Sequence, residues 1–148
     1  MVIRSWPALV PYFEKVRSLD KDCFGKAAWD QSTWRKMFEH RDLFVVLVEQ
    51  DNLLEGYCLV SQVLDEAELL KIGVWYNLRR KGKGRELFQQ AVTELATRNF
   101  RKLHLEVRSD NYPALQFYRR LGFKQTGFRA NYYANPECDA LLFSYPID

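Results

Sequence analysis

Apolar residues in this 148-residue chain recur every three to four positions in some segments and every second position in others, so the sequence predicts both helices and strands. Segments with helical spacing are bounded by polar residues, and continuous or alternating apolar runs lie between turn-forming residues. The predicted helices cover residues 8–19, 32–40, a segment that begins near 83, and a segment that ends at 121. The predicted strands cover residues 43–48, 56–63, 68–75, 102–108, 123–129 and 140–145.

Residues at the ends of these segments favour caps and turns. Ser32 is a suitable N-cap for the second helix, and Asp110 or Asn111 for the last, because a short polar side chain can accept from the first free N–H groups. Gly122 follows the last helix where a left-handed residue is preferred. The Asp-Asn pair at 51–52 predicts a turn, so the first two strands are expected to form a hairpin.

The order of the segments predicts the fold class. Two helices precede three strands, and strands and helices then alternate before two closing strands. This order favours an α/β (α+β mixed) fold in which a mixed sheet carries helices on both faces. In the strand over 102–108, one face would hold Leu103, Leu105 and Val107, and the other His104, Glu106 and Arg108.

Composition narrows the class of protein. With 47% hydrophobic and 28% charged residues, the chain is long enough for one domain with a full core, so a single domain over 1–148 is expected. The longest purely apolar stretch, residues 6–13, is too short to span a membrane, and no membrane partner is expected. Three well-separated cysteines predict reduced thiols in a cytoplasmic protein. Two histidines without ligand spacing predict no metal site.

Basic residues are concentrated in one turn, residues 79–85, which we call the basic turn. It holds five of the 22 lysines and arginines, so the rest of the chain has 17 basic against 19 acidic residues. Glycines, a following helix start and basic side chains are what a phosphate-binding turn requires. A solvated turn or a nucleic-acid patch is the alternative. Nucleic-acid binding would require basic and aromatic residues interleaved over a broad face, which the sequence does not show, so no nucleic-acid partner is expected.

The glycine spacing in the basic turn excludes two common phosphate motifs. The Walker loop needs Gly-x-x-x-x-Gly-Lys-Ser/Thr, and the dinucleotide fingerprint needs a third glycine where this chain has Leu87. The pattern Arg79-x-x-Gly82-x-Gly84 instead resembles the Gln/Arg-x-x-Gly-x-Gly/Ala signature of the GNAT N-acyltransferases. A second motif of that superfamily follows in the right order, with matches at Asn111, Ala114, Phe117, Tyr118, Gly122 and Phe123.

Finer similarity indicates the RimI type of this superfamily, the bacterial ribosomal-protein-alanine N-acetyltransferases. This similarity runs from about Gln62 to the C-terminus, and the first 60 residues carry little of it. The chain departs from the family pattern at Gly73, where alanine is usual, and at Tyr76, where proline is usual. Independently of the family, a glycine inside a strand usually marks a bulge or a close approach by a backbone or ligand.

The resemblance implies a GNAT-like fold and acetyl-CoA as co-substrate, without a metal. The sheet would be mixed and mostly antiparallel, with six to seven strands and one splayed pair. The pantetheine arm of the coenzyme would lie between the splayed strands, and its pyrophosphate on the basic turn. The residues implied in coenzyme binding are Ile72, Gly73, Val74, Arg79, Arg80, Lys81, Gly82, Lys83, Gly84, Arg85 and Asn111, although helix capping alone would explain Asn111.

Acyl transfer from a thioester to an amine needs a base for the amine and a proton for the departing thiolate. The resemblance implies Glu106 as the base, acting directly or through water, and Tyr118 as the acid. A phenol with an ordinary pKa of about 10 keeps its proton at neutral pH. The alternatives are a structural carboxylate at Glu106 paired with Arg108, and Tyr118 as one more aromatic side chain in the core.

The acceptor side is implied to include Asn131, Tyr132 and Tyr133, unless these residues only connect two strands. A lone carboxylate suits an α-amine, which is roughly 10% neutral at pH 7, better than a lysine, which is neutral in roughly a few parts per ten thousand. The expected activity is acetylation of the N-terminal alanine of a small-subunit ribosomal protein, by a protein favoured to be monomeric. A lysine or small-molecule amine acetyltransferase and a non-catalytic acetyl-CoA-binding module are the alternatives.

Overall fold

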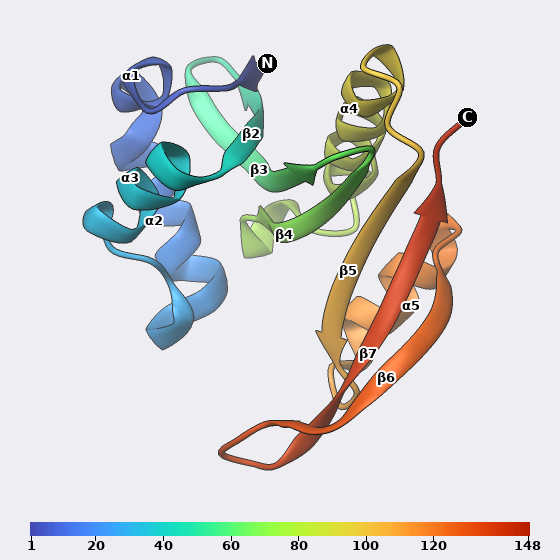
Figure 1. The fold of residues 1–148 in the computed structure, drawn as a ribbon. Helices are drawn as coiled ribbons and strands as arrows, with labels where there is room; N and C mark the ends of the chain where they lie inside the picture. The colour runs from blue at the N-terminus through green and yellow to red at the C-terminus, as the bar shows by residue number, and fades with distance from the viewer.

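Seven strands form one sheet in the order β1-β2-β3-β4-β5-β7-β6 in a computed structural model of residues 1–148 (Figure 1). All neighbouring strands are antiparallel except β4 and β5, which are parallel. The strands are β1 (Val2–Ile3), β2 (Asp42–Gln50), β3 (Leu53–Val63), β4 (Glu66–Val74), β5 (Lys102–Arg108), β6 (Lys124–Tyr133) and β7 (Cys138–Pro146). The helices are α1 (Trp6–Leu9), α2 (Phe13–Phe24), α3 (Gln31–His40), α4 (Lys83–Thr97) and α5 (Tyr112–Leu121).

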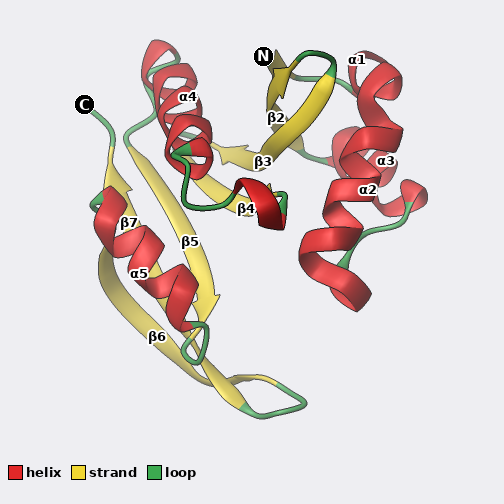
Figure 2. Ribbon diagram, turned by 180° about the vertical axis from the view of Figure 1, so that it is seen from behind, coloured by secondary structure: helices red, strands yellow, loops and turns green.

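Helices cover both faces of the sheet, as the segment order predicted. Figures 1 and 2 show α1, α2 and α3 on one face over β2 to β4, and α4 and α5 on the other. The apolar side chains accordingly form two clusters. The larger one joins α4 and α5 to the sheet, and the smaller one buries Trp34 and Tyr57 under the three N-terminal helices. The predicted mixed, mostly antiparallel sheet of six to seven strands is confirmed.

The strands β4 and β5 separate after a short pairing. Residues Glu66–Glu68 pair with Lys102–His104, and no pairing joins the two strands beyond that point. β4 continues to Val74 and β5 to Arg108, so their facing edges carry backbone groups without a strand partner. The predicted splayed pair is therefore present, and it opens a slot across the sheet that a ligand could enter as an extra strand.

Apolar and polar side chains of β5 point to opposite faces of the sheet, as their alternation in the sequence predicted. Leu105 and Val107 are buried against α4 and α5, so Glu106 between them projects from the opposite face. We call that side the Glu106 face. On β4, Lys71 and Gly73 lie on the same face, because they contact residues of α2 whereas Ile72 packs against the α4 and α5 cluster.

Several local predictions need correction in the N-terminal third. Asp30, and not Ser32, caps α3, because the Asp30 carboxylate accepts from Thr33 N. The helix predicted over 8–19 is divided by a 3₁₀ turn at Val10–Tyr12, where Pro11 has no N–H to donate, and α2 then runs on to Phe24. Strand β1 has only two residues and was not predicted.

The turns predicted at residues 51–52 and at Gly122 are confirmed. Asp51 and Asn52 both have a left-handed backbone, which suits the tight hairpin between β2 and β3. Gly122 ends α5 with a φ of 105°, as predicted, and Asn111 caps its start by accepting from Ala114 N. The connection predicted after residue 129 is shorter than expected, since β6 continues through Tyr133.

Candidate active site

The basic turn forms a ring of free backbone donors at the start of α4. Arg80 and Gly82 have positive φ angles, and Gly82 takes the N-cap position without a capping side chain. The first backbone bond of the helix runs from Glu86 N to Gly82 O, and no N–H group between Arg80 and Arg85 donates to another backbone carbonyl. Together with the positive end of the helix dipole, these donors suit an anion such as a phosphate.

The basic side chains of this turn divide into two groups. Arg80, Lys81 and Arg85 are exposed and make no ion pair within the protein. Arg79 turns back onto β4, where its Nε donates to Val74 O over 3.1 Å. Lys83 lies 3.1 Å from the largely buried carboxylate of Glu55. Three of the five predicted side chains are thus free to reach an anion, whereas Arg79 and Lys83 already hold the turn to the sheet.

Gly84 lets α5 approach this turn closely. A Cβ atom at position 84 would lie 2.8 Å from Phe117 Cζ, which is too short for a carbon contact. Phe117 therefore packs directly on the first turn of α4, next to the free N–H groups. The glycine pattern of the basic turn thus serves two purposes: Gly82 allows the left-handed turn, and Gly84 allows the contact between helices.

The slot between β4 and β5 is bounded on the β4 side by Ile72, Gly73 and Val74, as predicted for the coenzyme arm. Gly73 itself pairs regularly with Tyr57 of β3. A Cβ atom there would lie 2.9 Å from both Cys23 Sγ and Tyr57 Cε1. The close approach indicated by this glycine is therefore made by side chains of the protein, and the irregular pairing of β4 lies earlier, opposite Leu59 and Val60.

Glu106 projects beside this slot and is partly exposed. Its carboxylate lies 3.3 Å from Arg129 Nε of β6. Glu106 does not pair with Arg108, which binds Asp110 and Pro136 O instead, and the alternative of a paired structural carboxylate now concerns its ion pair with Arg129. Arg129 reaches Glu106 across β7, where the small Ala140 lies between the two outer strands in the register.

A second carboxylate lies near Glu106. Glu68 of β4 pairs with His104, two residues before Glu106 on the same face of β5. Burial, and then the neighbouring charge of Glu106, raise the pKa of Glu68 above the ordinary value. Burial and the same carboxylate also raise the pKa of Tyr133. Glu106 thus forms an ion pair with Arg129, and Glu68 and Tyr133 lie near enough for its charge to raise their pKa values.

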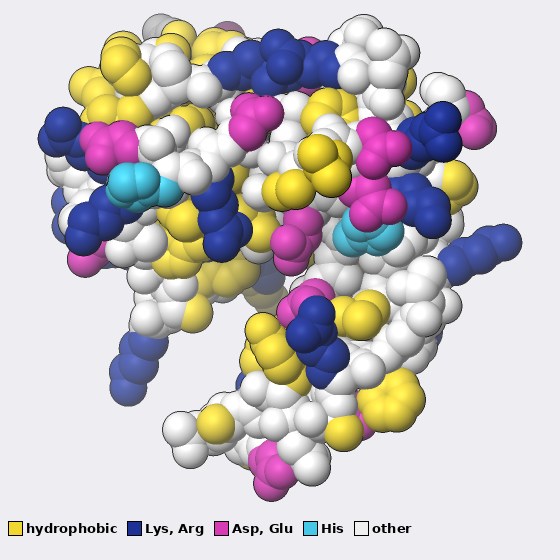
Figure 3. Space-filling view, viewed as in Figure 1, with side chains coloured by type: hydrophobic (Ala, Val, Ile, Leu, Met, Phe, Trp, Pro, Cys, Tyr) yellow, Lys and Arg dark blue, Asp and Glu magenta, His cyan; other side chains and the backbone are white.

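Sequence reasoning missed Glu68 and Arg129 as neighbours of Glu106. The polar face of each strand is visible in the sequence, but the parallel register of β4 with β5 and the return of β6 beside β7 are not. Figure 3 shows this side of the molecule hollowed between the three N-terminal helices and the arm formed by β6 and β7, with acidic and basic side chains beside the hollow.

Tyr118 lies on the other side of the sheet. Its ring packs against Phe117 and Phe123 at centroid distances of 5.4 and 5.7 Å, within the α4 and α5 cluster. Burial raises the pKa of the Tyr118 phenol above its ordinary value, so the group keeps its proton at neutral pH. The hydroxyl lies in this largely buried environment and makes no hydrogen bond within the protein.

The three residues predicted on the acceptor side lie at the end of β6. Tyr132 and Tyr133 contact each other edge to face, and Arg108 lies 5.0 Å from the ring centroid of Tyr133. Asn131 has a left-handed backbone, and its N–H donates to Asp139. A depression of about 460 Å³ lies along the hairpin from Asn131 to Glu137. The three residues therefore form the end of a strand, and Tyr133 lies near enough to Glu106 for that carboxylate to raise its pKa.

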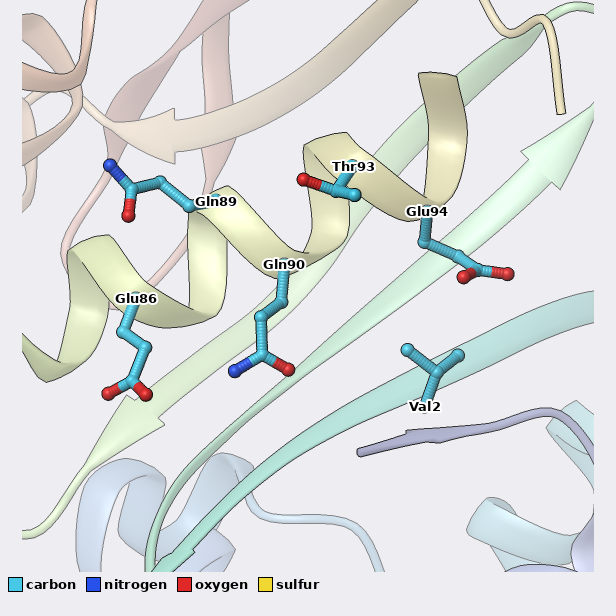
Figure 4. A pocket seen from close by; sticks show the side chains of 6 residues that line it. All are labelled: Val2, Glu86, Gln89, Gln90, Thr93 and Glu94. Carbon is cyan, nitrogen blue, oxygen red and sulfur yellow. The ribbon is translucent and has the colours of Figure 1, made fainter. Parts of the chain in front are cut away.

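A separate depression of about 320 Å³ lies on the outer side of α4 beside β1. Figure 4 shows Glu86 and Gln90 pointing from α4 to the side on which Val2 lies, with Glu94 above Val2. Two carboxylates and no basic side chain line it, so it does not suit a phosphate-bearing ligand. No group of His, Cys, Asp and Glu side chains in the chain is arranged to hold a metal ion. None of the helices has the length and apolar character needed to cross a membrane.

Comparison with known sequences identifies a family profile and close relatives that match most of this chain. The profile of the acetyltransferase (GNAT) family matches residues 13–123. The [ribosomal protein bS18]-alanine N-acetyltransferase of Salmonella typhimurium is 36% identical over 121 residues, which cover 80% of this chain and 81% of that protein.

Comparison with solved structures gives the same fold. The ribosomal-protein-S18-alanine N-acetyltransferase of Escherichia coli superposes with a TM-score of 0.81 at 28% identity, covering all of this chain and 95% of the other. An aminoglycoside 6'-N-acetyltransferase complexed with coenzyme A superposes with a TM-score of 0.84 over all of this chain and 97% of the other. At 14% identity, that second likeness concerns the fold alone.

Proposed function

The chain belongs to the acetyltransferase (GNAT) family, and from this membership we propose that it transfers an acetyl group from acetyl-CoA to the α-amine of the N-terminal alanine of ribosomal protein bS18. The relative from Salmonella typhimurium and the solved structure from Escherichia coli are named for that reaction. The similarity to the Salmonella relative covers 80% of the chain, and the family profile spans residues 13–123, which include the basic turn, the strands that border the slot and Glu106. A ribosomal acceptor would place the reaction in the cytoplasm, and residues 1–148 would act as a single domain.

The donor is proposed to bind along the slot. The free N–H groups from Arg80 to Arg85 would hold the pyrophosphate, with the exposed cations of Arg80, Lys81 and Arg85 around it. The unpaired edges of β4 and β5 would bind the pantetheine arm, so that the thioester lies near Gly73. Asn111 caps α5, and its side-chain NH₂ has no partner and is free for the coenzyme.

The acceptor amine would reach the thioester from the Glu106 face. Glu106 takes a proton from the α-ammonium through a water molecule, and the neutral nitrogen attacks the carbonyl carbon. The nitrogen of the tetrahedral intermediate loses a second proton to water, the intermediate collapses with cleavage of the C–S bond, and the thiolate takes its proton from the Tyr118 hydroxyl. An N-acetylated terminus and free coenzyme A result, and the phenol regains a proton from solvent.

The position of Glu106 carries this proposal. It is the carboxylate beside the open part of the slot, on the face bounded by the three N-terminal helices and by the β6 and β7 arm. The neighbouring carboxylate of Glu68 adds negative charge, which favours the approach of a terminal ammonium group. Tyr132 and Tyr133 at the end of β6 provide apolar surface for the first residues of a peptide.

The experiment is incubation of the purified protein with acetyl-CoA and peptides. One peptide would begin with the N-terminal sequence of bS18, a second would carry the same sequence with a blocked terminus and internal lysines, and a third would replace the first alanine by lysine. Mass spectrometry should find one acetyl group on the terminus of the first peptide only. Acetylation of internal lysines alone would identify the alternative lysine acetyltransferase. Binding of acetyl-CoA without any transfer would identify a non-catalytic module, and either result would refute the proposal.

A further inference from the structure

A buried polar cluster lies under the N-terminal helices and takes no part in the proposed chemistry. Asp20 of α2 is fully buried, and its Oδ1 accepts from Tyr57 OH over 2.6 Å and from Lys71 Nζ over 2.8 Å. Its Oδ2 accepts from Trp29 N over 2.8 Å. Every bond of this carboxylate therefore goes to a different element: α2 is joined to β3, to β4 and to the segment before α3.

Lys71 completes the cluster inside a box of aromatic rings. Its Nζ lies 4.3 Å from the ring centroid of Trp29, 4.9 Å from that of Phe24 and 5.7 Å from that of Trp34. These distances are within the range of a cation–π interaction. Burial lowers the pKa of Lys71, and the hydrogen bond and charge of Asp20 oppose that shift.

Stability alone is a weak reason for such a cluster. Burying two charges costs solvation free energy that their attraction rarely exceeds, and apolar replacements of buried ion pairs are often equally stable. A buried pair with complete hydrogen bonding is better at fixing one arrangement of the groups around it. The question is therefore which part of the molecule it fixes.

The groups fixed by the cluster lie next to the acyl end of the slot. Lys71 is two residues before Gly73 on the same face of β4, and Tyr57 packs directly over Gly73. Cys23, three residues after Asp20 on α2, fills the remaining space over Gly73 and lies 3.6 Å from Val74 O. The cluster thus supports the side of the slot from which the acceptor would approach.

The segment 24–29 depends on the cluster for its position. It joins α2 to α3 through a 3₁₀ turn at Gly25–Ala27 and makes few backbone bonds of its own, one of them from Ala28 N to Gly25 O. Trp29 N is bound by Asp20, and the Phe24 and Trp29 rings pack around the Lys71 ammonium. Figure 1 shows this segment on one side of β4 and the β6 and β7 arm on the other.

We propose that Asp20 and Lys71 are positioning residues that hold segment 24–29 as the wall of the acceptor site opposite Tyr132 and Tyr133. This inference rests on the proposed acetyl transfer to a peptide terminus. The pair acts through Trp29 and Phe24 and through the packing over Gly73, and it contacts neither the coenzyme nor the acceptor. Its loss is therefore expected to affect use of the peptide more than binding of acetyl-CoA.

The test compares a triple variant with a matched control. Asp20→Leu, Tyr57→Phe and Lys71→Met together remove all charges and the hydroxyl of the cluster, so no buried charge is left unpaired. The control Lys15→Met with Glu49→Gln removes an exposed ion pair that also joins α2 to the sheet, far from Gly73. Thermal unfolding of both proteins establishes that they are folded. The single variant Asp20→Asn is also prepared, for measurement of hydrogen exchange.

For the triple variant, kcat/KM for the peptide should fall about tenfold or more, as expected when a binding wall shifts by a fraction of an ångström. The Kd for acetyl-CoA should change by less than about twofold, because the substitutions keep the backbone groups of β4 that face the slot, and the control should match the wild type. Peptide kinetics equal to the wild type in the folded triple variant, or equal losses in peptide use and acetyl-CoA binding, would overturn the inference.

Hydrogen exchange separates this inference from the proposed function. The amides of segment 24–30 should exchange faster in Asp20→Asn and in the triple variant, while amides of α4 and α5 keep their protection. This measurement needs no acceptor. Unchanged exchange in the segment refutes the positioning role even if the peptide is acetylated. Absence of peptide acetylation by the wild type refutes the proposed function and with it the acceptor wall.

Discussion

Glu106 and Tyr118 lie on opposite faces of the central sheet. Glu106 projects between the buried Leu105 and Val107 and pairs with Arg129, whereas Tyr118 packs in the cluster formed by α4 and α5. The slot between β4 and β5 connects the two faces, and we propose that a ligand lying in it meets both groups. The proposed base therefore belongs to the acceptor side and the proposed acid to the coenzyme side, and the thioester carbonyl would lie between them.

Replacement of Glu106 by glutamine is expected to lower kcat/KM for the peptide about 100-fold, since the amine loses its proton acceptor. Binding of acetyl-CoA, measured by calorimetry, should be unchanged. Glu66→Gln is the matched control, because Glu66 is an exposed carboxylate of the same strand pair that binds His104. Equal activity of Glu106→Gln and wild type would exclude Glu106 as the base.

Tyr118→Phe is expected to lower kcat about tenfold or more while the Kd for acetyl-CoA stays constant, because only the proton for the thiolate is lost. The melting temperature should hardly change, since the hydroxyl has no hydrogen-bond partner in the protein. Tyr145→Phe removes a hydroxyl from the same aromatic cluster and should keep full activity. A Tyr118→Phe enzyme with wild-type kcat would leave Tyr118 as a core residue only.

Removal of the exposed cations of the basic turn is expected to weaken the binding of acetyl-CoA. Arg80→Ala with Arg85→Ala should raise the Kd by about 10-fold at low salt, and by less at high salt, because these cations are screened. Lys36→Ala with Lys124→Ala removes the same charge from exposed sites on α3 and β6 and serves as the control. If both double variants bind equally well, the basic turn does not hold the phosphates.

Gly73→Ala is expected to lower the melting temperature by about 3–8 °C, because the new Cβ would lie 2.9 Å from Cys23 Sγ and Tyr57 Cε1. Combining it with Cys23→Ala should restore part of the loss, since one of the two contacts is removed. Calorimetry of the four proteins in this cycle measures the coupling. A Gly73→Ala protein as stable as the wild type would show that the side chains of Cys23 and Tyr57 can move aside to accommodate the new Cβ atom.

Glu68→Gln is expected to raise the melting temperature by about 1–2 °C at pH 7–8. Burial and Glu106 raise the pKa of Glu68 in the folded state, so the ionised carboxylate destabilises the fold, and glutamine mimics its protonated form. As the pH falls through the raised pKa, the wild type takes up the proton and the difference should disappear. Melting curves from pH 4 to pH 8 follow this convergence, and a constant or inverse difference would contradict it.

Local patterns were enough to predict much of the candidate site. The period of two along residues 102–108 placed Glu106 on the polar face of β5, because successive side chains of a strand alternate. Gly122 predicted a left-handed position at a helix end, and the glycines of the basic turn predicted a curled backbone, since glycine adopts such conformations freely. The free N–H groups of the basic turn follow from the same local geometry.

Other features depended on contacts between distant segments. Ser32 and Asp30 are both acceptable caps, and the observed start of α3 at Gln31 selects Asp30. The pair of Glu106 with Arg129 requires β6 to return beside β7, where Arg129 pairs with Ala140 and Glu106 with Leu142. No spacing within the sequence specifies that register.

The sequence by itself determined the alternation of strands and helices, the anion-binding turn, the position of Glu106 on its strand and the family, because each of these is carried by residues within a few positions of one another. The tertiary structure alone decided that β4 and β5 run parallel and separate after Glu68 and His104. It also decided that Asp20 binds Lys71 under an aromatic box, 51 positions away in the chain. Such pairings are set by the packing of whole elements against each other, and packing is a property of the folded chain.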